Sequence, residues 1–149
     1  MAVEIRRATI DDLETLLPLV TGYREFYKRT ADPEQEREFM RSHLERATSV
    51  VFIAFVDGRA AGFVQLYPTF STTNLKPALI LEDLFVSPEA RKGGLASKLL
   101  ARANEYMREI GASGMFLETA MDNLTAQSVY ERNGWTREAT FYKYNAPVS

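Results

Sequence analysis

Cysteine is absent from this sequence of 149 residues, which excludes disulfide bonds, thiolate metal ligands and a cysteine nucleophile. Histidine occurs once, at His43, and no metal-ligand spacing surrounds it, so we expect no metal cofactor and only a packed or solvated helical histidine. No apolar run reaches the length of a membrane-spanning helix, and the first residues, MAVEIRRATIDD, contain no signal-peptide segment. These absences predict a cytoplasmic protein that does not bind membranes.

An excess of basic charge is also lacking. The formal net charge is −2, whereas a general nucleic-acid binder usually carries a basic excess, so nucleic acid is not an expected partner. A cationic substrate remains compatible with this charge. Apolar residues make up 46% and charged residues 26% of the chain, as in an ordinary globular protein. At this length we expect residues 1–149 to form a single domain with a sizeable core.

The stretch Ala78–Leu100 organises the chain. Its first part, Ala78–Val86, is apolar on both faces, which predicts a central strand covered on both sides. One face of this strand should carry Leu79, Leu81 and Phe85. Two adjacent carboxylates, Glu82 and Asp83, interrupt the apolar run, and since an unpaired buried carboxylate is costly, each has a task or a partner such as a core arginine. Adjacent strand residues face opposite sides, so only one carboxylate should point into a site unless a bulge redirects the other.

A basic glycine loop, Arg91-Lys92-Gly93-Gly94, follows this strand and precedes a helix that begins near Leu95. A helix N-terminus leaves its first N–H groups without internal partners and carries partial positive charge, so it suits an anion. The glycines allow close approach of the backbone, and the two basic side chains add charge. The alternative is a solvent-facing turn. Neither a Walker loop nor a dinucleotide fingerprint fits, because lysine precedes the glycines and only two adjacent glycines are present.

The remaining sequence predicts further strands and helices. Thr9 marks a capped helix start, Pro18 predicts a kink or early end of that helix, and Asp32 caps a second helix. Asp57-Gly58 is typical of a hairpin, and Pro68 should end its second strand. The expected elements are strands at Val3–Arg6, Ser49–Val56, Arg59–Tyr67 and Met115–Ala120, helices at Leu95–Glu109 and Leu124–Arg132, and one or two strands in Trp135–Tyr144.

Two motifs resemble the GCN5-related N-acetyltransferase (GNAT) superfamily. Arg91-x-x-Gly94-x-Ala96 is similar to the coenzyme A loop of that family, and Asn123-x-x-Ala126-x-x-Val129-Tyr130-x-x-x-Gly134-Trp135 is similar to its second cofactor segment. The resemblance covers nearly the whole chain, and the run LEDLFV places it nearest the polyamine/diamine and Hpa-type acetyltransferases. It implies an α/β (α+β) fold with a mixed, twisted sheet of six to seven strands and helices on both faces. A homodimer is also expected from the resemblance.

The resemblance assigns roles to individual residues. Tyr130 would be the general acid for the leaving thiolate, and Glu82 the base, through water. Asp83 would share that role or bind a second cationic group, while Tyr27 and Phe70 are candidate substrate contacts. Acetyl-CoA would be held by Leu84, Phe85, Val86, Arg91, Lys92, Gly93, Gly94, Leu95, Ala96, Ser97, Asn123 and Ala126. Lys92 replaces the usual first glycine of the family loop, which bears on how the diphosphate is held.

The sequence thus indicates an N-acetyltransferase that moves an acetyl group from acetyl-CoA to a primary amine by direct attack. The favoured acceptor is a small-molecule amine such as a polyamine or amino acid, because acidic residues near the acceptor suit a polycation. The alternatives are a protein lysine or N-terminal acetyltransferase and a non-catalytic acyl-CoA-binding module.

Overall fold

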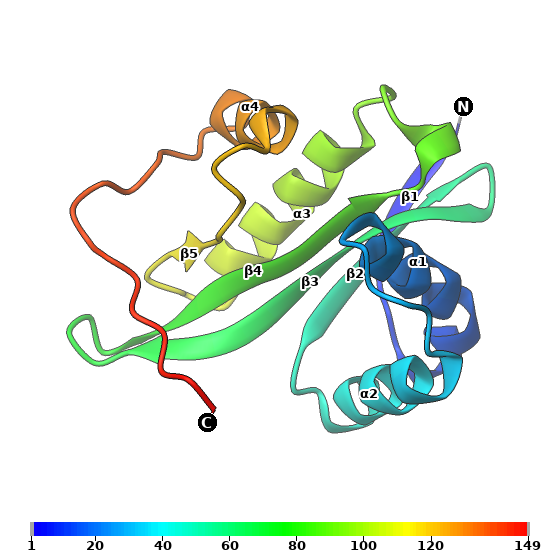
Figure 1. The fold of residues 1–149 in the computed structure, drawn as a ribbon, viewed down its shortest axis with the longest axis horizontal. Helices are drawn as coiled ribbons and strands as arrows, with labels where there is room; N and C mark the ends of the chain where they lie inside the picture. Colours follow the sequence, from blue (N-terminus) through cyan, green and yellow to red (C-terminus); the bar gives the residue numbers. More distant parts are fainter. Residues whose placement is uncertain (1, 149) are drawn as a thin grey trace. The chain divides into compact units, whose positions relative to one another are not determined.

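The computed structural model describes residues 2–148. The chain divides into two compact units, one ending at Glu118 and the other beginning at Thr119. The first unit contains a five-stranded sheet with the order β1-β2-β3-β4-β5 (Figure 1). Its strands are β1 (Val3–Arg7), β2 (Val50–Val56), β3 (Arg59–Ser71), β4 (Lys76–Val86) and β5 (Met115–Phe116). β1 to β4 are antiparallel neighbours and β5 runs parallel to β4, so the predicted mixed sheet is present.

The prediction of six to seven strands is wrong, because the part of the chain that the structure describes forms five. Trp135–Tyr144 was expected to supply one or two strands and contains none. Its Phe141, Tyr142 and Tyr144 side chains are 81%, 90% and 91% exposed. Aromatic residues favour strands mainly by packing on a half-buried pleated surface, and that burial is missing here.

Helices cover both faces of the sheet, as expected (Figure 1). Adjacent residues of a strand point to opposite faces, which identifies the cover of each face. Phe63 of β3 packs with Leu16 of α1 (Leu13–Phe26), in the cluster that also contains Met40 of α2 (Pro33–Arg46). The neighbouring Gly62 instead lies against Leu99 of α3 (Leu95–Glu109). Within residues 2–148, no helix combines the length and apolarity needed to cross a membrane.

The predicted helix starts are confirmed, but the early end that was one of the two expectations at Pro18 is absent. Thr9 forms a capping box at the first helical turn, and the side chain of Asp32 accepts a hydrogen bond from the backbone at the start of α2. Pro18 does not end α1, which continues to Phe26. The buried side chains of this helix are Leu13, Leu16, Leu17, Leu19 and Val20. Their packing spans the proline, so it outweighs the one backbone hydrogen bond that proline cannot donate.

β3 is longer than the sequence predicts. Pro68 was expected to end this strand, which instead continues to Ser71. The last residue pair between β2 and β3 is Val50 with Leu66, so beyond Leu66 this edge of β3 no longer has β2 beside it. A proline, which lacks an N–H group, is tolerated on such an edge.

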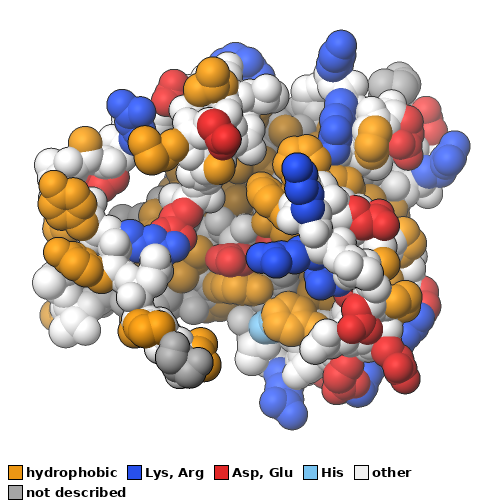
Figure 2. Space-filling model, in the orientation of Figure 1, with side chains coloured by type: hydrophobic (Ala, Val, Ile, Leu, Met, Phe, Trp, Pro, Cys, Tyr) orange, Lys and Arg blue, Asp and Glu red, His pale blue; other side chains and the backbone are white. Residues whose placement is uncertain are grey.

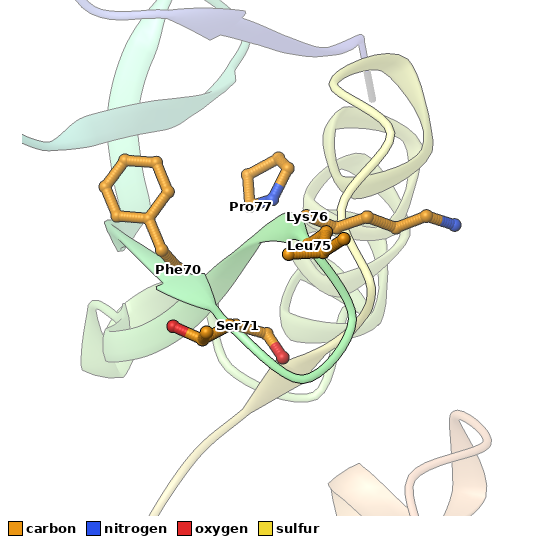
Figure 3. Close-up of a pocket in the computed structure, with 6 residues that line it drawn as sticks. Phe70, Ser71, Leu75, Lys76 and Pro77 are labelled. Atoms are coloured by element: carbon orange, nitrogen blue, oxygen red, sulfur yellow. The ribbon is translucent and has the colours of Figure 1, made fainter.

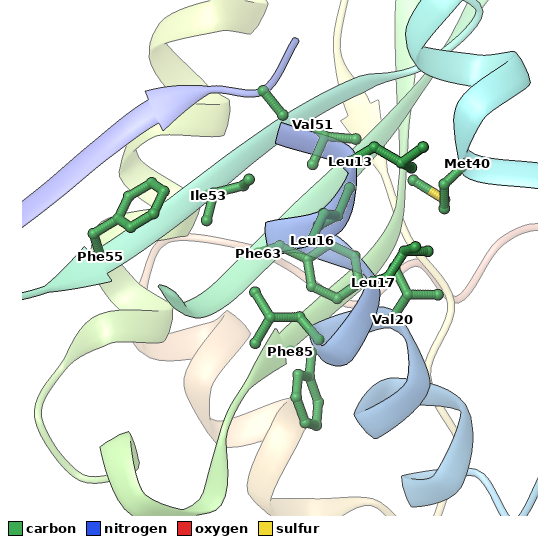
Figure 4. Close-up of a cluster of buried hydrophobic side chains, with 12 residues drawn as sticks. Leu13, Leu16, Leu17, Val20, Met40, Val51, Ile53, Phe55, Phe63 and Phe85 are labelled. Atoms are coloured by element: carbon green, nitrogen blue, oxygen red, sulfur yellow. The ribbon is translucent and has the colours of Figure 1, made fainter. Parts of the chain in front are cut away.

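The core on the α1 side joins the helices to the strand that carries the carboxylates. Buried side chains from α1, α2, β2, β3 and β4 meet there (Figure 4). The labelled members are Leu13, Leu16, Leu17, Val20, Met40, Val51, Ile53, Phe55, Phe63 and Phe85. Phe85 anchors the last residues of β4 in this core, immediately before the glycine loop.

A buried ion pair ties α1 to α2. Glu36, only 5% exposed, accepts hydrogen bonds from Thr21 Oγ1 and Arg24 Nη1, each at 2.5 Å, and from the N–H group of Asp32 at 3.2 Å. Burial alone would raise the pKa of Glu36, but these bonds outweigh it and hold the pKa below its ordinary value. The carboxylate therefore stabilises the fold in its ionised form.

Replacing Glu36 by alanine is expected to lower the free energy of unfolding at neutral pH by about 2–3 kcal/mol. This is below the cost for a fully buried pair, because the Arg24 side chain remains 33% exposed. The folded-state pKa is depressed, so the contribution is present above the unfolded-state pKa and is lost as the pH falls through the folded one. Chemical denaturation at neutral pH and at about pH 3 should show the difference shrinking in acid. Arg37→Ala, which breaks an exposed pair with Glu14, is the control and should cost under about 1 kcal/mol.

Candidate active site

A β-bulge interrupts β4 at the two carboxylates. Gln65 of β3 lies opposite Asp83, whereas the next residue, Leu66, lies opposite Leu81. Glu82 is therefore an extra residue in the ladder. A bulge locally bends the strand and changes the direction of side chains. The bulge therefore allows Glu82 and Asp83 to point into one site.

The bulge also overturns the predicted faces of β4. Leu79, Leu81 and Phe85 were expected on one side, but directly opposed residues of a sheet share a face. Phe85 pairs with Phe63, on the α1 side, while Leu79 and Leu81 pair with even-numbered residues of β3 that face α3. The extra residue reverses the alternation between them. Asp83 consequently points to the face that α1 and α2 cover.

Both carboxylates act on the same tyrosines. The hydroxyl of Tyr23 in α1 donates to the backbone oxygen of Glu82 at 3.4 Å. Burial raises the pKa of Tyr23, and the charges of Asp83 and Glu82 raise it further. Burial and the same two charges raise the pKa of Tyr67 in β3 to about 12. The bulge therefore gathers negative charge beside two phenols that stay protonated.

Asp83 is held by a buried polar chain. Gln65 Nε2 donates to Asp83 Oδ2 at 2.5 Å, and Ser49 Oγ donates to Gln65 Oε1 at 2.8 Å. The partner of this carboxylate is therefore the Gln65 amide, and not the core arginine that was one of the expectations. Burial raises the pKa of Asp83, opposed by hydrogen bonds from Gln65 and Tyr23 and by the charge of His43.

Aromatic rings from three elements lie near these carboxylates, and we call them the aromatic wall: Tyr23 and Tyr27, Tyr67, and His43 of α2. The ring centroids of Tyr23 and Tyr27 are 5.0 Å apart. His43 stacks on Tyr67 with centroids 5.7 Å apart, and its Nδ1 lies 2.7 Å from Thr48 Oγ1. Figure 2 shows this single histidine beside hydrophobic side chains. Aromatic faces combined with carboxylates suit an ammonium group.

Sequence reasoning missed Ser49, Gln65 and Tyr67. It assigned Glu82, Asp83, Tyr27 and Phe70 to the acceptor side of the site. One signal was available: Gln65 interrupts an apolar run, as the two carboxylates do in β4. A buried amide needs hydrogen-bond partners as a buried carboxylate does.

The glycine loop has the backbone geometry of an anion site. Gly94, the N-cap of α3, has φ +75°, and Lys92 has φ +73°. The first bond of the helix runs from the N–H group of Lys98 to the oxygen of Gly94 at 3.2 Å. The N–H groups of Leu95–Ser97 precede that bond and therefore point out of the helix end. Residues 91–94 are exposed, so the predicted diphosphate site is accessible.

Replacing Lys92 by glycine should raise the free energy of unfolding by up to about 1 kcal/mol, because a left-handed backbone conformation strains a side chain and not glycine. The matched change is Gly94→Ala, which introduces the same strain where an added Cβ meets nothing within 4 Å. That variant should lose about 1 kcal/mol. Thermal and chemical denaturation test both signs. Equal changes in the free energy of unfolding of the two variants would contradict the backbone strain assigned to Lys92.

Arg91 contacts β4 and α1, in addition to the diphosphate-binding role predicted for it. Its Nε donates to the backbone oxygen of Val86 at 2.9 Å. Its guanidinium lies over the rings of Phe26 and Phe85, 5.6 and 5.7 Å from their centroids. Arg91 thus joins the end of β4 to the end of α1, beside the aromatic wall.

Within residues 2–148, β5 pairs with β4 at Leu79 and Ile80. No strand of these residues pairs with the second half of that edge of β4, which we call the open edge. Ser87 N–H donates to Ala61 of β3, so by strand alternation the backbone groups of Phe85 also point to β3. Those of the predicted cofactor contacts Leu84 and Val86 then point to the open edge. This edge can pair with an extended ligand chain.

The second unit contains α4 (Leu124–Arg132). Asn123 caps this helix, with its Oδ1 accepting from the N–H group of Ala126 at 3.2 Å. The ring of Tyr130 lies 5.9 Å from that of Trp135. Spacings of three and four put Asn123, Ala126 and Tyr130 on one helix face, as expected. The cap shows that the asparagine also has a structural role.

Phe70 lies away from the carboxylates. It is 82% exposed and, with Ser71, Leu75 and Pro77, lines a shallow hollow at the tip of the β3–β4 hairpin (Figure 3). Phe70 pairs with Pro77, roughly 20 Å along the strand from Asp83. The structure brings Tyr27 to the carboxylate site and does not bring Phe70 there.

Known proteins resemble this chain in sequence and in fold. Residues 16–135 match the acetyltransferase (GNAT) family. The chain is 40% identical over 148 residues to the uncharacterized N-acetyltransferase YhfO of Bacillus subtilis, covering 98% of this chain and 99% of the relative. It is 32% identical over 108 residues to a thialysine N-epsilon-acetyltransferase of Caenorhabditis elegans, covering 72% of this chain and 67% of that protein. A crystal structure of a probable acetyltransferase is similar with a TM-score of 0.93 and 41% identity, covering 98% of both chains.

Together, the fold and the named relatives define an acetyl-CoA-dependent acyltransferase. The chain belongs to the acetyltransferase (GNAT) family.

Proposed function

We propose that this enzyme acetylates a primary amine of a small cationic molecule, such as a polyamine or an amino acid, by direct attack of the amine on acetyl-CoA. The observation that carries this proposal is the bulge of β4, which gathers Glu82 and Asp83 beside the aromatic wall. Carboxylates attract an ammonium group by charge, and the aromatic faces attract it by their quadrupole. The similarity to a thialysine N-epsilon-acetyltransferase supports an amine acceptor.

Acetyl-CoA would be held by the loop and the open edge of β4. N–H groups at the start of α3 bind the diphosphate, because a helix N-terminus favours negative charge. The backbone groups of Leu84 and the N–H group of Val86 pair with the pantetheine arm. The family motif also assigns Asn123 and Ala126 to acetyl-CoA binding.

The chemistry requires the ammonium form of the acceptor to lose two protons and the leaving thiolate to gain one. An alkylamine with a pKa near about 10 is mostly protonated at neutral pH, so a base must remove a proton before attack. A carboxylate of the bulge, Glu82 or Asp83, takes that proton. The neutral nitrogen then attacks the thioester carbon and gives a tetrahedral oxyanion whose nitrogen is positively charged. That nitrogen loses a second proton to solvent as the oxyanion collapses and expels the thiolate. Tyr130 protonates the thiolate as general acid.

Thiol release from acetyl-CoA by the purified protein tests this function across a panel of polyamines, amino acids, aminoglycosides and a basic peptide. Turnover on a small amine, with loss of activity when it is replaced by its N-acetylated form, is the expected result. Turnover confined to the peptide would overturn the small-amine proposal in favour of a protein acetyltransferase. Binding of acetyl-CoA with no turnover on any amine would favour a binding module.

A further inference from the structure

We propose that Ser49 and Gln65 are positioning residues that hold Asp83 as the group which takes the proton from the acceptor amine. This inference rests on the proposed function and decides between its two candidate bases. Nothing in the sequence separates Glu82 from Asp83. The structure gives Asp83 a buried polar chain, whereas the side chain of Glu82 is exposed.

The chain is built from buried side chains. Ser49 is 4% and Gln65 2% exposed, and each link has hydrogen-bond length, 2.8 Å from Ser49 to Gln65 and 2.5 Å from Gln65 to Asp83. A buried amide and hydroxyl are costly unless they are paired. Apolar side chains would fill these positions without that cost. The presence of a buried polar chain therefore indicates a role at Asp83, the carboxylate that it reaches.

The chain can serve both protonation states of Asp83. An ionised carboxylate only accepts hydrogen bonds, so Gln65 presents its NH₂ group to Asp83 and its carbonyl oxygen accepts from the Ser49 hydroxyl. A protonated carboxyl can donate instead. If the amide rotates by half a turn, its oxygen accepts from Asp83 and its NH₂ group donates to Ser49 Oγ. No buried polar atom loses its partner in either state.

This property suits a group that gains and loses a proton in every cycle. The ammonium form of the acceptor transfers H⁺ to an oxygen of Asp83, directly or through water, which leaves a neutral amine and a neutral carboxyl group. The neutral amine attacks acetyl-CoA, and Asp83 later returns the proton to solvent. Total charge and atoms are conserved in the transfer, and no other reactant is needed.

Several titratable groups face Asp83 from the elements packed around it. They are Tyr23 of α1, His43 of α2, Tyr67 of β3 and Glu82 beside it on β4. Both tyrosines have pKa values raised by burial, so neither competes for the proton near neutral pH. Burial lowers the pKa of His43. Glu82 is exposed, and its carboxylate can attract the cation without taking its proton.

The pH profile of kcat/KM tests the inference. In the wild type the acid limb should follow a group of the enzyme, so it should stay at the same pH for two acceptor amines of different basicity. Gln65→Met removes the donor to the ionised carboxylate at nearly constant volume. The acid limb should then move to higher pH, and kcat/KM at neutral pH should fall about 10- to 100-fold. Ser49→Ala should move the limb in the same direction, and Ser49→Thr, which keeps the hydroxyl, should restore it.

Two further variants make the outcomes decisive. Thr21→Val removes a hydroxyl that donates to Glu36 at 2.5 Å and should lower stability without moving the limb. Glu82→Gln should raise the KM for the amine and leave the limb in place. A limb that stays fixed in folded Gln65→Met, or one that disappears in Glu82→Gln, would overturn the role of Asp83 while leaving acetylation itself intact. Absence of wild-type turnover on any amine would instead be a failure of the proposed function.

Discussion

Replacing Tyr130 by phenylalanine should lower kcat by about 10²–10⁴-fold, the usual contribution of a positioned general acid. The substitution removes only the hydroxyl group, and the ring that lies 5.9 Å from Trp135 remains. The ring contact with Trp135 should therefore persist in the variant. The KM for acetyl-CoA should change little, because the contacts proposed for its diphosphate and pantetheine arm do not include this hydroxyl.

The choice of leaving group separates this role from simple packing. A thioester whose thiol has a lower pKa needs less protonation on departure, so Tyr130→Phe should be less impaired with such a donor. Tyr130→Ala is the companion variant, which also removes the ring contact and should lower stability. A phenylalanine variant with wild-type kcat would exclude the hydroxyl from catalysis.

Replacing Gly62 by alanine should lower the free energy of unfolding by about 2–3 kcal/mol. An added Cβ would lie 2.7 Å from the backbone oxygen of Phe85 and 3.4 Å from Leu99. The first contact is with backbone in the paired strand β4, so it cannot be relieved by rotating a side chain. β4 must therefore move at Phe85 and Val86, which lie at the edge proposed to bind acetyl-CoA. The KM for acetyl-CoA should therefore rise together with the loss of stability.

Gly114→Ala is the matched control. This glycine precedes β5, and an added Cβ meets nothing within 4 Å. It should change the free energy of unfolding by less than about 0.5 kcal/mol. Chemical denaturation measures the free energy of unfolding of both variants. Equal losses would show that the close approach of Gly62 to Phe85 does not cause the destabilisation.

Local patterns were sufficient to predict most elements of the fold. Asp32 marks the start of α2, and Asn123 marks that of α4, because capping depends on side chains next to the helix. The glycine loop before α3 could also be predicted, because glycine permits the tight left-handed turn into a helix start. Predictions that depended on neighbours in space were less successful. A proline ends a strand only where a neighbouring strand needs an N–H group at that position, and β2 no longer lies beside Pro68.

The candidate site depended on one feature that alternation cannot reveal. The bulge at Glu82 arises from a shift in register between β3 and β4, and neither strand alone contains a signal for it. It decides which face Asp83 occupies and brings that carboxylate to Gln65. The residue types could therefore be named from the sequence, but their grouping required the ladder.

The central claim is direct transfer of an acetyl group to an amine, and product analysis tests it most directly. Purified enzyme is incubated with acetyl-CoA, with and without an accepted amine, and the protein mass, free thiol and acetylated amine are measured in the same sample. The predicted result is an unmodified protein without amine and, with amine, one acetylated product for each thiol released. An acetylated enzyme that forms with acetyl-CoA alone and then passes its acetyl group to the amine would contradict the account.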